Sequence, residues 1–251
     1  MISPDDLALA PAPDHAPDDQ EDPLAPLRLL PDPPPSIHHQ HLHLHFPGPL
    51  ALSLLVDAAP GCGGIAWPAG QVLATYLARR PDPALHRKSV LELGSGTGLV
   101  GLVAAAKGAR VCITDQAQLL PTMTRNIALN AHAHAFPVAA AELNWGEPLP
   151  LPAHDDAATP IIPRPRALDL LLAADCVYLE PAFAPLVHTL CALVPPASPC
   201  EVLFCYKKRR KADKRFFALL KKHFTWEDVT DDPDRATYAR EAISLLRLHR
   251  R

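Results

Sequence analysis

The chain has 251 residues, of which 48% are hydrophobic, and its formal net charge at pH 7 is −3. These values predict one α/β domain with a sizeable core, and the small net charge gives no support for bulk binding to nucleic acid. The sequence shows neither a signal peptide nor a membrane span, and none of its six cysteines forms a C-x-x-C pair. We therefore expect a cytoplasmic protein with reduced thiols and no attachment to a membrane.

Residues 1–36 are rich in proline, alanine and aspartate, which predicts a disordered acidic leader. Such a segment is either a solvated tail or a partner-binding region. Residues 36–57 alternate between polar and apolar side chains around Pro47-Gly48-Pro49, which predicts a β-hairpin. Its alternating histidines, from His39 to His45, share one face and are read either as metal ligands or as an exposed polar face. We predict no metal site, because no cysteine or carboxylate in that strand completes one.

Residues 90–101 predict a buried strand, a glycine turn and the start of a helix. A dinucleotide fingerprint would place its third glycine at position 99, where the chain has Leu99. Glu92 lies just before the turn, where it would repel a pyrophosphate and attract a cationic sulfonium that carries an amino group. The turn, which contains Gly94, Ser95 and Gly96, therefore predicts an S-adenosylmethionine site. The alternative is that its glycines serve only packing.

Two further residues belong to the predicted cofactor pocket. Trp67 precedes Pro68 at the predicted start of a helix and is either part of the core or a wall of the pocket. The strand at 109–115 ends at Asp115, which follows Gly94 by 21 residues. A carboxylate at this place can accept hydrogen bonds from both ribose hydroxyls; the alternative is an N-cap of the following helix.

The middle of the chain continues the alternation of strands and loops. A third strand is predicted over residues 136–143, and Trp145 follows it at the same edge of the sheet, where an adenine would lie. Residues 147–166 are dense in proline and predict a flexible surface loop. The central strand, 167–175, leads into Asp175-Cys176-Val177-Tyr178 at its carboxyl end, where open α/β sheets bind ligands.

The remaining elements follow in chain order: a helix over 183–193, a strand over 200–206, a basic run at 207–211 that leads into an amphipathic helix, and strands over 226–229 and 242–248. Seven strands therefore follow the leading hairpin and alternate with helices. This pattern predicts a mostly parallel, Rossmann-like seven-stranded sheet with an antiparallel final pair.

Five motifs occur together and in order: Trp67-Pro68-Ala69-Gly70, the glycine turn at 91–101, Thr114-Asp115, Leu143-Asn144-Trp145-Gly146 and Ala174-Asp175-Cys176-Val177-Tyr178. They resemble the seven-β-strand methyltransferase family 16, which includes protein-lysine methyltransferases related to methyltransferase-like protein 21. The resemblance covers roughly residues 37–251 and implies a class I methyltransferase domain that uses S-adenosylmethionine. It implies that Trp67, Gly94, Gly96, Asp115, Trp145 and Ala174 contact this cofactor, and we add Glu92 and Ser95 of the glycine turn.

The resemblance also implies that residues 175–178 face the channel for the methyl acceptor. A free lysine has a pKa of about 10.4 and must lose its proton before it accepts a methyl group. We expect Asp175 to orient the lysine amine and Tyr178 to line the channel. The alternative is that Asp175 fixes the methionine end of the cofactor or caps a helix. The sequence names no dedicated general base.

The region 206–217, which contains the basic run, looks like that of fungal family members that methylate a lysine of translation elongation factor 1A. We therefore expect this protein as the substrate, a monomeric enzyme and no direct nucleic-acid partner. The basic run itself has three interpretations: a solvated helix entry, a nuclear import signal, or a docking surface for a folded acidic partner or for RNA bound to it.

Two other classes of function remain open. The first is a methyltransferase that acts on another protein, RNA or a small molecule. Enzymes that methylate base amino groups usually carry a Pro-Pro-aromatic motif after the central strand, where this chain has Asp175-Cys176-Val177-Tyr178. The second is a non-catalytic cofactor-binding adaptor, against which the intact Glu92, Gly94 and Asp115 argue.

Overall fold

The computed structural model describes residues 40–57, 62–150, 162–209 and 211–251. The predicted leader, at residues 1–36, lies outside the described residues, and so does the central part of the insertion predicted at 147–166. His39 lies outside them as well. The predictions for these parts of the chain stay predictions.

The first two strands, β1 (Gln40–His45) and β2 (Ala51–Val56), form the predicted antiparallel hairpin. The backbone N–H of Phe46 donates to the carbonyl of Leu50 at 2.9 Å and closes the turn. Leu52 and Leu54 of β2 are buried in the core, whereas most of β1 stays exposed. The alternation read from the sequence therefore separates a core face from a polar face.

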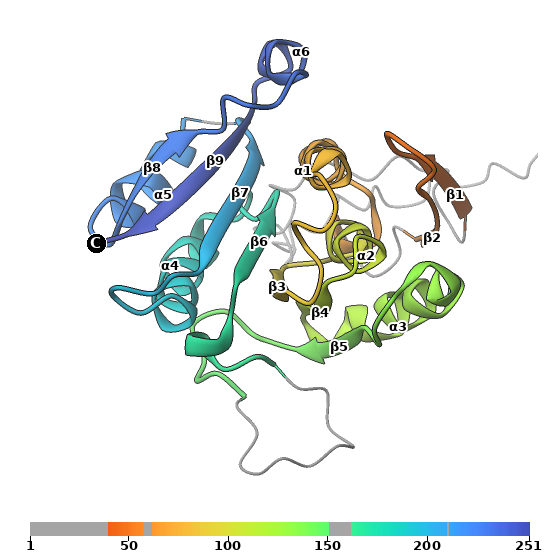
Figure 1. Cartoon of the computed structure of the whole chain (residues 1–251). Helices are drawn as coiled ribbons and strands as arrows, with labels where there is room; N and C mark the ends of the chain where they lie inside the picture. The colour runs from red at the N-terminus through yellow and green to blue at the C-terminus, as the bar shows by residue number, and fades with distance from the viewer. Residues whose placement is uncertain (1–39, 58–61, 151–161, 210) are drawn as a thin grey trace, which may run out of the picture. The chain divides into compact units, whose positions relative to one another are not determined.

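Seven further strands form the main sheet: β3 (Ser89–Leu93), β4 (Arg110–Asp115), β5 (Ala139–Glu142), β6 (Leu170–Ala174), β7 (Glu201–Lys207), β8 (Phe224–Asp228) and β9 (Ile243–Arg250). Their order is β5-β4-β3-β6-β7-β9-β8 (Figure 1). The pairs from β5 to β7 are parallel, and β9 runs antiparallel to both of its neighbours. The predicted α/β class with a mostly parallel seven-stranded sheet is confirmed.

The helices are α1 (Pro68–Arg79), α2 (Leu99–Ala106), α3 (Leu120–Leu129), α4 (Phe183–Leu193), α5 (Asp213–Leu220) and α6 (Arg235–Arg240). Short 3-10 turns occur at η2 (Cys62–Gly64), η3 (Ala117–Leu119), η4 (Ala131–Ala133), η5 (Pro165–Ala167) and η6 (Glu180–Ala182). The sequence does not predict α6, which is too short to show a helical repeat of apolar residues.

The third predicted strand, 136–143, is too long, because β5 covers only Ala139–Glu142. Pro137 has no N–H to donate and cannot occupy an inner position of the ladder. The ring of Phe136 instead packs against His86, with a ring-centroid distance of 5.8 Å, and under the guanidinium of Arg110.

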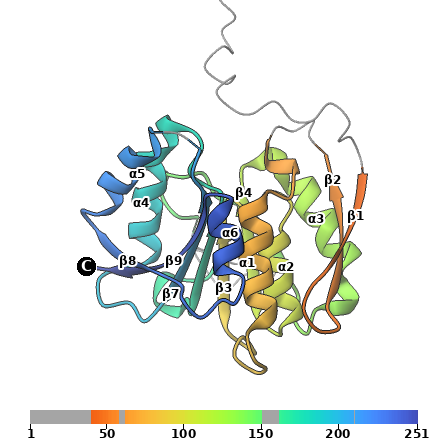
Figure 2. The same ribbon diagram turned by 90° about the horizontal axis from the view of Figure 1, so that it is seen from above.

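Both faces of the sheet are covered by helices (Figure 2). Along β6, Leu170 and Leu172 belong to the core shared with α1, α2 and α3, whereas Leu171 and Ala173 belong to the core shared with α4 and α5. The strand is therefore apolar at every position, which explains why its sequence shows a continuous hydrophobic run instead of alternation.

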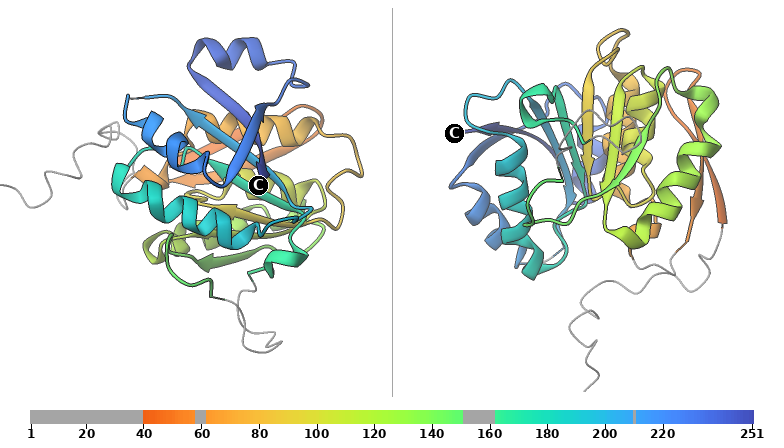
Figure 3. Two further views of the ribbon diagram at one scale, coloured as in Figure 1. Left: turned by 90° about the vertical axis from the view of Figure 1, so that its left-hand side faces the viewer. Right: turned by 90° about the horizontal axis from the view of Figure 1, so that it is seen from below.

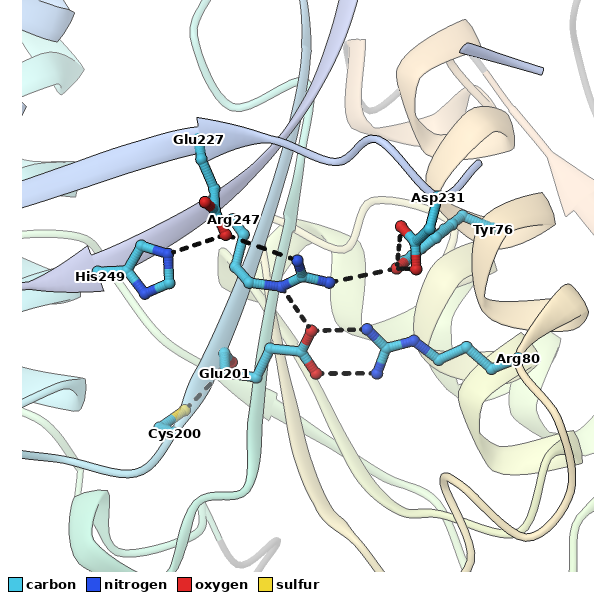
Figure 4. A network of polar contacts seen from close by, with 8 residues as sticks. All are labelled: Tyr76, Arg80, Cys200, Glu201, Glu227, Asp231, Arg247 and His249. Atoms are coloured by element: carbon cyan, nitrogen blue, oxygen red, sulfur yellow. Dashed lines mark hydrogen bonds and ion pairs between the residues drawn. The ribbon is translucent and has the colours of Figure 1, made fainter. Parts of the chain in front are cut away.

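A network of charged side chains joins α1 to β7 and β9 (Figure 4). Arg80 donates to both carboxylate oxygens of Glu201, at 2.9 and 2.7 Å, and Arg247 Nε donates to the second of these oxygens at 3.1 Å. Burial acts to raise the pKa of Glu201, but the bonds and charges of the two arginines outweigh it and lower this pKa. Because Glu201 begins β7, the network stabilises the sheet at the end opposite to the carboxyl ends of its parallel strands.

The histidines of β1 do not gather a metal-binding set within the described residues, where no group of three or more His, Cys, Asp or Glu side chains is suitably placed. His43 Nδ1 instead lies 2.9 Å from Ser53 Oγ. The five cysteine side chains that the structure describes are free thiols, as predicted. None of the helices in the described parts of the chain has the length and apolar character needed to cross a lipid bilayer.

The hairpin lies beside α3 (Figure 3). Two buried asparagines, Asn126 in α3 and Asn130 at its C-cap, hold the hairpin against the domain. Asn126 Oδ1 accepts the N–H of Leu55 at 2.7 Å, and its Nδ2 donates to the carbonyls of Leu55 at 3.1 Å and Thr97 at 2.9 Å. Asn130 makes the same pair of bonds to Ser53, at 2.9 and 2.8 Å. Both asparagines are completely buried, and their amide groups take the place of water as hydrogen-bond partners of the backbone of β2.

We expect Asn126→Ala to lower the free energy of unfolding by about 2–3 kcal/mol, because each buried backbone group that loses its partner costs about 1–3 kcal/mol. The measurement is the urea midpoint. Arg125→Ala is the matched control, because Arg125 is the exposed neighbour on the same helix. Equal midpoints for the two variants would contradict this role of Asn126.

Candidate functional site

The strands β3, β4, β5, β6 and β7 are parallel, so their carboxyl ends lie along one edge of the sheet (Figure 1). The predicted site residues gather at this edge. The glycine turn follows β3, Asp115 is the last residue of β4, Trp145 follows β5, and Asp175 follows β6. Trp67 is the N-cap of α1. The parallel arrangement of the strands therefore places segments that are far apart in sequence at one edge.

The glycine turn has the backbone conformation that its composition predicts. Gly94, Gly96 and Gly98 have positive φ values of 58°, 56° and 82°, and Gly98 is the N-cap of α2. A Cβ atom on Gly94 would lie 2.9 Å from Cζ2 of Trp145, and one on Gly96 would lie 2.4 Å from the carbonyl oxygen of Gly63. Glycine is therefore required here both by the backbone conformation and by close neighbours.

Ser95 and Asp115 fix the turn to the end of β4. Ser95 donates its N–H to the carbonyl of Thr114 at 2.9 Å, and Ser95 Oγ accepts the N–H of Thr114 at 2.9 Å. Asp115 Oδ2 accepts the N–H of Gly96 at 2.8 Å, and its Oδ1 accepts the N–H of Gln116 at 2.8 Å. Burial raises the pKa of Asp115 even though these two N–H groups act to lower it.

These contacts bear on two predictions for the turn. Gln116, and not Asp115, is the N-cap of the 3-10 turn that follows β4, so the alternative capping role of Asp115 is wrong. The Ser95 side chain is buried and bonded to the backbone, so it shapes the turn. Cofactor contacts by Ser95 and Asp115 stay predictions.

Glu92 lies beneath the first turn of α2. Its side chain is 2% exposed, and Oε2 accepts the N–H of Gly101 at 2.8 Å. Burial raises the pKa of Glu92 to about 8, against the hydrogen bonds from Gly101 and Ser95, and the charge of Asp115 adds to the rise. An uncompensated carboxylate is therefore costly here, and a nearby cation would favour its charged form.

Trp145 lies beside the glycine turn, as predicted. Its indole is the nearest group to the position of a Cβ on Gly94, and Cys176 Sγ lies 3.1 Å from the same position. The loop that carries Trp145 is attached to α4, because the N–H of Gly146 donates to Thr189 Oγ1 at 2.9 Å. The indole is therefore positioned by two elements from different parts of the chain.

Asp175 follows Ala174, the last residue of β6, and has a positive φ of 56°. Its carboxylate is 5% exposed and accepts three hydrogen bonds. Oδ1 accepts the N–H of Lys207 at 3.1 Å and Arg209 Nη1 at 2.8 Å, and Oδ2 accepts Arg209 Nη2 at 3.1 Å. A non-glycine residue in this conformation is strained, and such strain persists where surrounding contacts hold it.

Arg209 is the site residue that the sequence reasoning missed. None of the three interpretations of the basic run assigns its residues to the site, yet Arg209 pairs with Asp175. The guanidinium carbon of Arg209 lies 5.4 Å from the ring centroid of Trp67. The feature of the sequence that could have identified Arg209 is its position two residues after β7, because β7 pairs with β6 and ends beside it. Trp67 itself is half-buried at the N-cap of α1, and Tyr178 is half-buried in the loop after Asp175.

Cys176 is a second buried group that the sequence reasoning did not assign. Its Sγ lies 3.4 Å from the carbonyl oxygen of Leu93, which joins the end of β6 to the end of β3. Burial raises the pKa of this thiol, and the negative charges of Asp115, Asp175 and Glu92 act in the same direction. The thiol therefore stays protonated and packs beneath the site.

Comparison with known proteins identifies the family. The sequence model for a family described as lysine methyltransferase matches residues 49–223. The chain is also 40% identical over 218 residues to the protein-lysine N-methyltransferase EFM6 of Saccharomyces cerevisiae, with 80% of this chain and 87% of that protein covered.

The chain belongs to the lysine methyltransferase family. The enzyme is also 35% identical over 183 residues to the protein N-lysine methyltransferase METTL21A of Mus musculus, covering 72% of this chain and 78% of that protein. It is 34% identical over 177 residues to EEF1A lysine methyltransferase 3 of Mus musculus, covering 69% of each. The family resemblance drawn from the five motifs is confirmed.

A solved structure supports the fold. The enzyme matches the T. thermophilus 16S rRNA N2 G1207 methyltransferase RsmC, in complex with AdoMet and guanosine, with a TM-score of 0.52 and 19% identity. The match covers 84% of this chain and 50% of that chain. At this identity the likeness concerns the fold alone, and it agrees with the predicted class I methyltransferase sheet.

We expect Glu92→Gln to stabilise the enzyme, when no cofactor is bound, increasingly as the pH rises from about 4.5 to about 8. The pKa of Glu92 is about 8 in the folded enzyme against an ordinary value of 4.5, so folding takes up a proton in this range. Below about pH 4.5 the carboxyl is protonated in both the folded and the unfolded enzyme, and burial of its charge costs no stability. As the pH rises to about 8, the unfolded state loses this proton and the folded state keeps it, so the wild-type enzyme becomes progressively less stable. Glutamine keeps an oxygen for the N–H of Gly101 and carries no charge.

The measurement is the difference in Tm between this variant and the wild type at several pH values between 5 and 8. A constant difference over that range would contradict the raised pKa. If Glu92 also faces the cation of the cofactor, calorimetry will show weaker cofactor binding by the variant, in spite of its higher Tm.

Proposed function

We propose that the enzyme transfers a methyl group from S-adenosylmethionine to the side-chain amine of a lysine in translation elongation factor 1A. The observation that carries this proposal is the convergence of the glycine turn, Trp145 and the 175–178 segment at one edge of the sheet, in a chain of the lysine methyltransferase family. One relative bears a name that states EEF1A as its target, which supports the identity of the substrate.

The residues at this edge fit the proposed cofactor. Gly94 brings the backbone of the turn against the indole of Trp145, which supplies a flat wall, and Asp115 ends the neighbouring strand with a carboxylate. When bound, the cofactor supplies an electrophilic methyl group on a sulfonium. The protein has to position the lysine amine in line with that methyl group, and positioning of this kind supplies much of the rate.

In support of a role at the acceptor, Asp175 directly follows β6 at this edge, and the thiol of the next residue, Cys176, lies 3.4 Å from the carbonyl oxygen of Leu93, just before the glycine turn. We propose that its carboxylate orients the lysine amine and that Tyr178 lines the channel. We further propose that the enzyme acts in the cytoplasm as a monomer and needs no nucleic acid.

A groove of about 440 Å³ next to the basic run suits the docking of the protein substrate. Half-exposed aromatic rings of Tyr206, Phe217 and Trp226 form its base, with centroid distances of 4.8 and 5.3 Å along the row. Its charged lining consists of the exposed amines of Lys208 and Lys214 and of two aspartates that already have partners. Asp213 accepts the N–H of Arg209, and Asp228 pairs with Arg235. We propose that a segment of elongation factor 1A with apolar and acidic side chains lies here beside the target lysine.

The direct test is incubation of the enzyme and labelled cofactor with a cell extract, followed by purified elongation factor 1A and mass spectrometry of its lysines. Label in this protein supports the proposal. Label in RNA or in a different protein, or no label at all, would overturn the proposed substrate.

We expect Asp175→Asn to lower kcat by at least about tenfold, which corresponds to about 1.4 kcal/mol of transition-state stabilisation. Asp169→Asn is the matched control, because Asp169 directly precedes the same strand and lies at its other end, where it accepts the N–H of Ser89 at 2.8 Å. Full turnover by Asp175→Asn with unchanged cofactor affinity would exclude its action on the acceptor.

We expect Lys208→Glu combined with Lys214→Glu to raise the KM for elongation factor 1A and to leave cofactor affinity unchanged, because the groove then repels an acidic segment. Arg209 is left intact in this variant, since its side chain belongs to the site. The control carries the same reversal at Lys221 and Lys222, which are exposed after the other end of α5. An equal KM in both variants would exclude docking in this groove.

A further inference from the structure

The Arg209 guanidinium connects three parts of the site. It donates to both carboxylate oxygens of Asp175, and it lies over the ring of Trp67 at 5.4 Å. Its own backbone is fixed as well, because the N–H of Arg209 donates to Asp213 Oδ2 at 2.9 Å. The side chains are 18% exposed for Arg209 and 5% for Asp175.

This pair differs from the other ion pair of the same region. Arg215 pairs with Glu180 on the surface, where both side chains are largely exposed and the contact adds little. The Arg209–Asp175 pair is withdrawn from water, and burial of two charges gains little stability compared with an apolar pair. Because stability alone does not explain this pair, and because it lies next to the proposed acceptor channel, we examine whether it acts in the reaction.

We propose that Arg209 is a positioning residue for methyl transfer: it fixes and neutralises the Asp175 carboxylate, so that the acceptor lysine meets an ion pair instead of a free anion. This inference rests on the proposed function of Asp175. A free carboxylate beside the lysine would stabilise the ammonium form, which cannot accept a methyl group. The guanidinium offsets that effect and favours the neutral amine.

Methyl transfer requires the neutral amine of the acceptor lysine. The lysine ammonium first releases its proton to solvent. The lone pair of the amine then forms the new N–C bond while the C–S bond breaks, and the electron pair of that bond stays on sulfur. The positive charge passes from sulfur to the methylated nitrogen, so an anion left uncompensated at Asp175 would hold back the first event.

The other titratable groups around Asp175 do not replace Arg209. The thiols of Cys176, in the loop after β6, and of Cys205, in β7, lie near Asp175, and burial raises the pKa of each, so both stay neutral. The other charged groups near this place, among the residues that the structure describes, are two neighbours of the pair and three carboxylates further off. They are Lys207, whose N–H bonds to Asp175, Asp213 at the start of α5, Asp232 near Cys205, and Glu92 and Asp115 near Cys176. Among the described residues, Arg209 is the one whose cationic group is within hydrogen-bond distance of the Asp175 carboxylate.

The test is the pH dependence of kcat for Arg209→Gln, with the protein substrate that the wild-type enzyme labels. We expect the rising limb of the kcat profile to move to higher pH by about one unit, because loss of the guanidinium leaves the Asp175 carboxylate uncompensated and stabilises the lysine ammonium. At pH 7, kcat should then be about tenfold lower. Arg209→Lys keeps the charge and should stay close to the wild-type profile. Lys222→Gln removes an exposed cation after the far end of α5 and serves as the matched control.

Three results would overturn the inference: an unshifted profile in Arg209→Gln, an equal shift in Arg209→Lys, or a rise in kcat when Arg209 is removed. The last result would mean that Arg209 obstructs the channel. If Arg209→Gln does not fold, the same profile is measured for Arg209→Met, which removes the charge and keeps an unbranched side chain over Trp67. Failure of the proposed function is distinct, since the wild-type enzyme would then label no lysine.

Discussion

The ion pair between Asp175 and Arg209 is the interaction on which the arrangement of the site depends. It holds a strained residue, with a φ of 56°, at the end of β6 and ties it to the end of β7 through the N–H of Lys207 and the Arg209 side chain. Through Trp67 the same guanidinium reaches the start of α1. Three segments of the chain are thereby fixed around one carboxylate, which is how a binding edge made of loops acquires a defined shape.

The amino and carboxyl ends of the parallel strands differ in how their charged groups affect stability. At the amino end of β7, Glu201 is satisfied by Arg80 and Arg247, and its lowered pKa makes the network stabilising at neutral pH. At the carboxyl ends, Glu92 is buried with a pKa raised to about 8, and Asp175 is strained. Such features cost stability, and they gather where the ligands of open α/β sheets bind.

Much of the fold follows from local patterns in the sequence. The apolar run at 167–175 predicts a strand that is buried on both faces, and the glycines at 94, 96 and 98 predict a turn with positive φ values. The structure shows both. The third strand is shorter than predicted because Pro137 cannot join the ladder. The place of Arg209 is harder to predict, since a run of charges is solvated in most proteins and its partner lies 34 residues away. Which cation of the basic run pairs with Asp175 depends on the geometry of two strand ends, which no local pattern encodes.

The most direct test of the Asp175–Arg209 pair as one unit is a double-mutant cycle on kcat/KM with Asp175→Asn, Arg209→Gln and the combination. If Arg209 acts through Asp175, the double variant will be no slower than Asp175→Asn alone, so the two losses will not add. Losses that multiply fully in the double variant would show that the two residues act independently and would contradict this account.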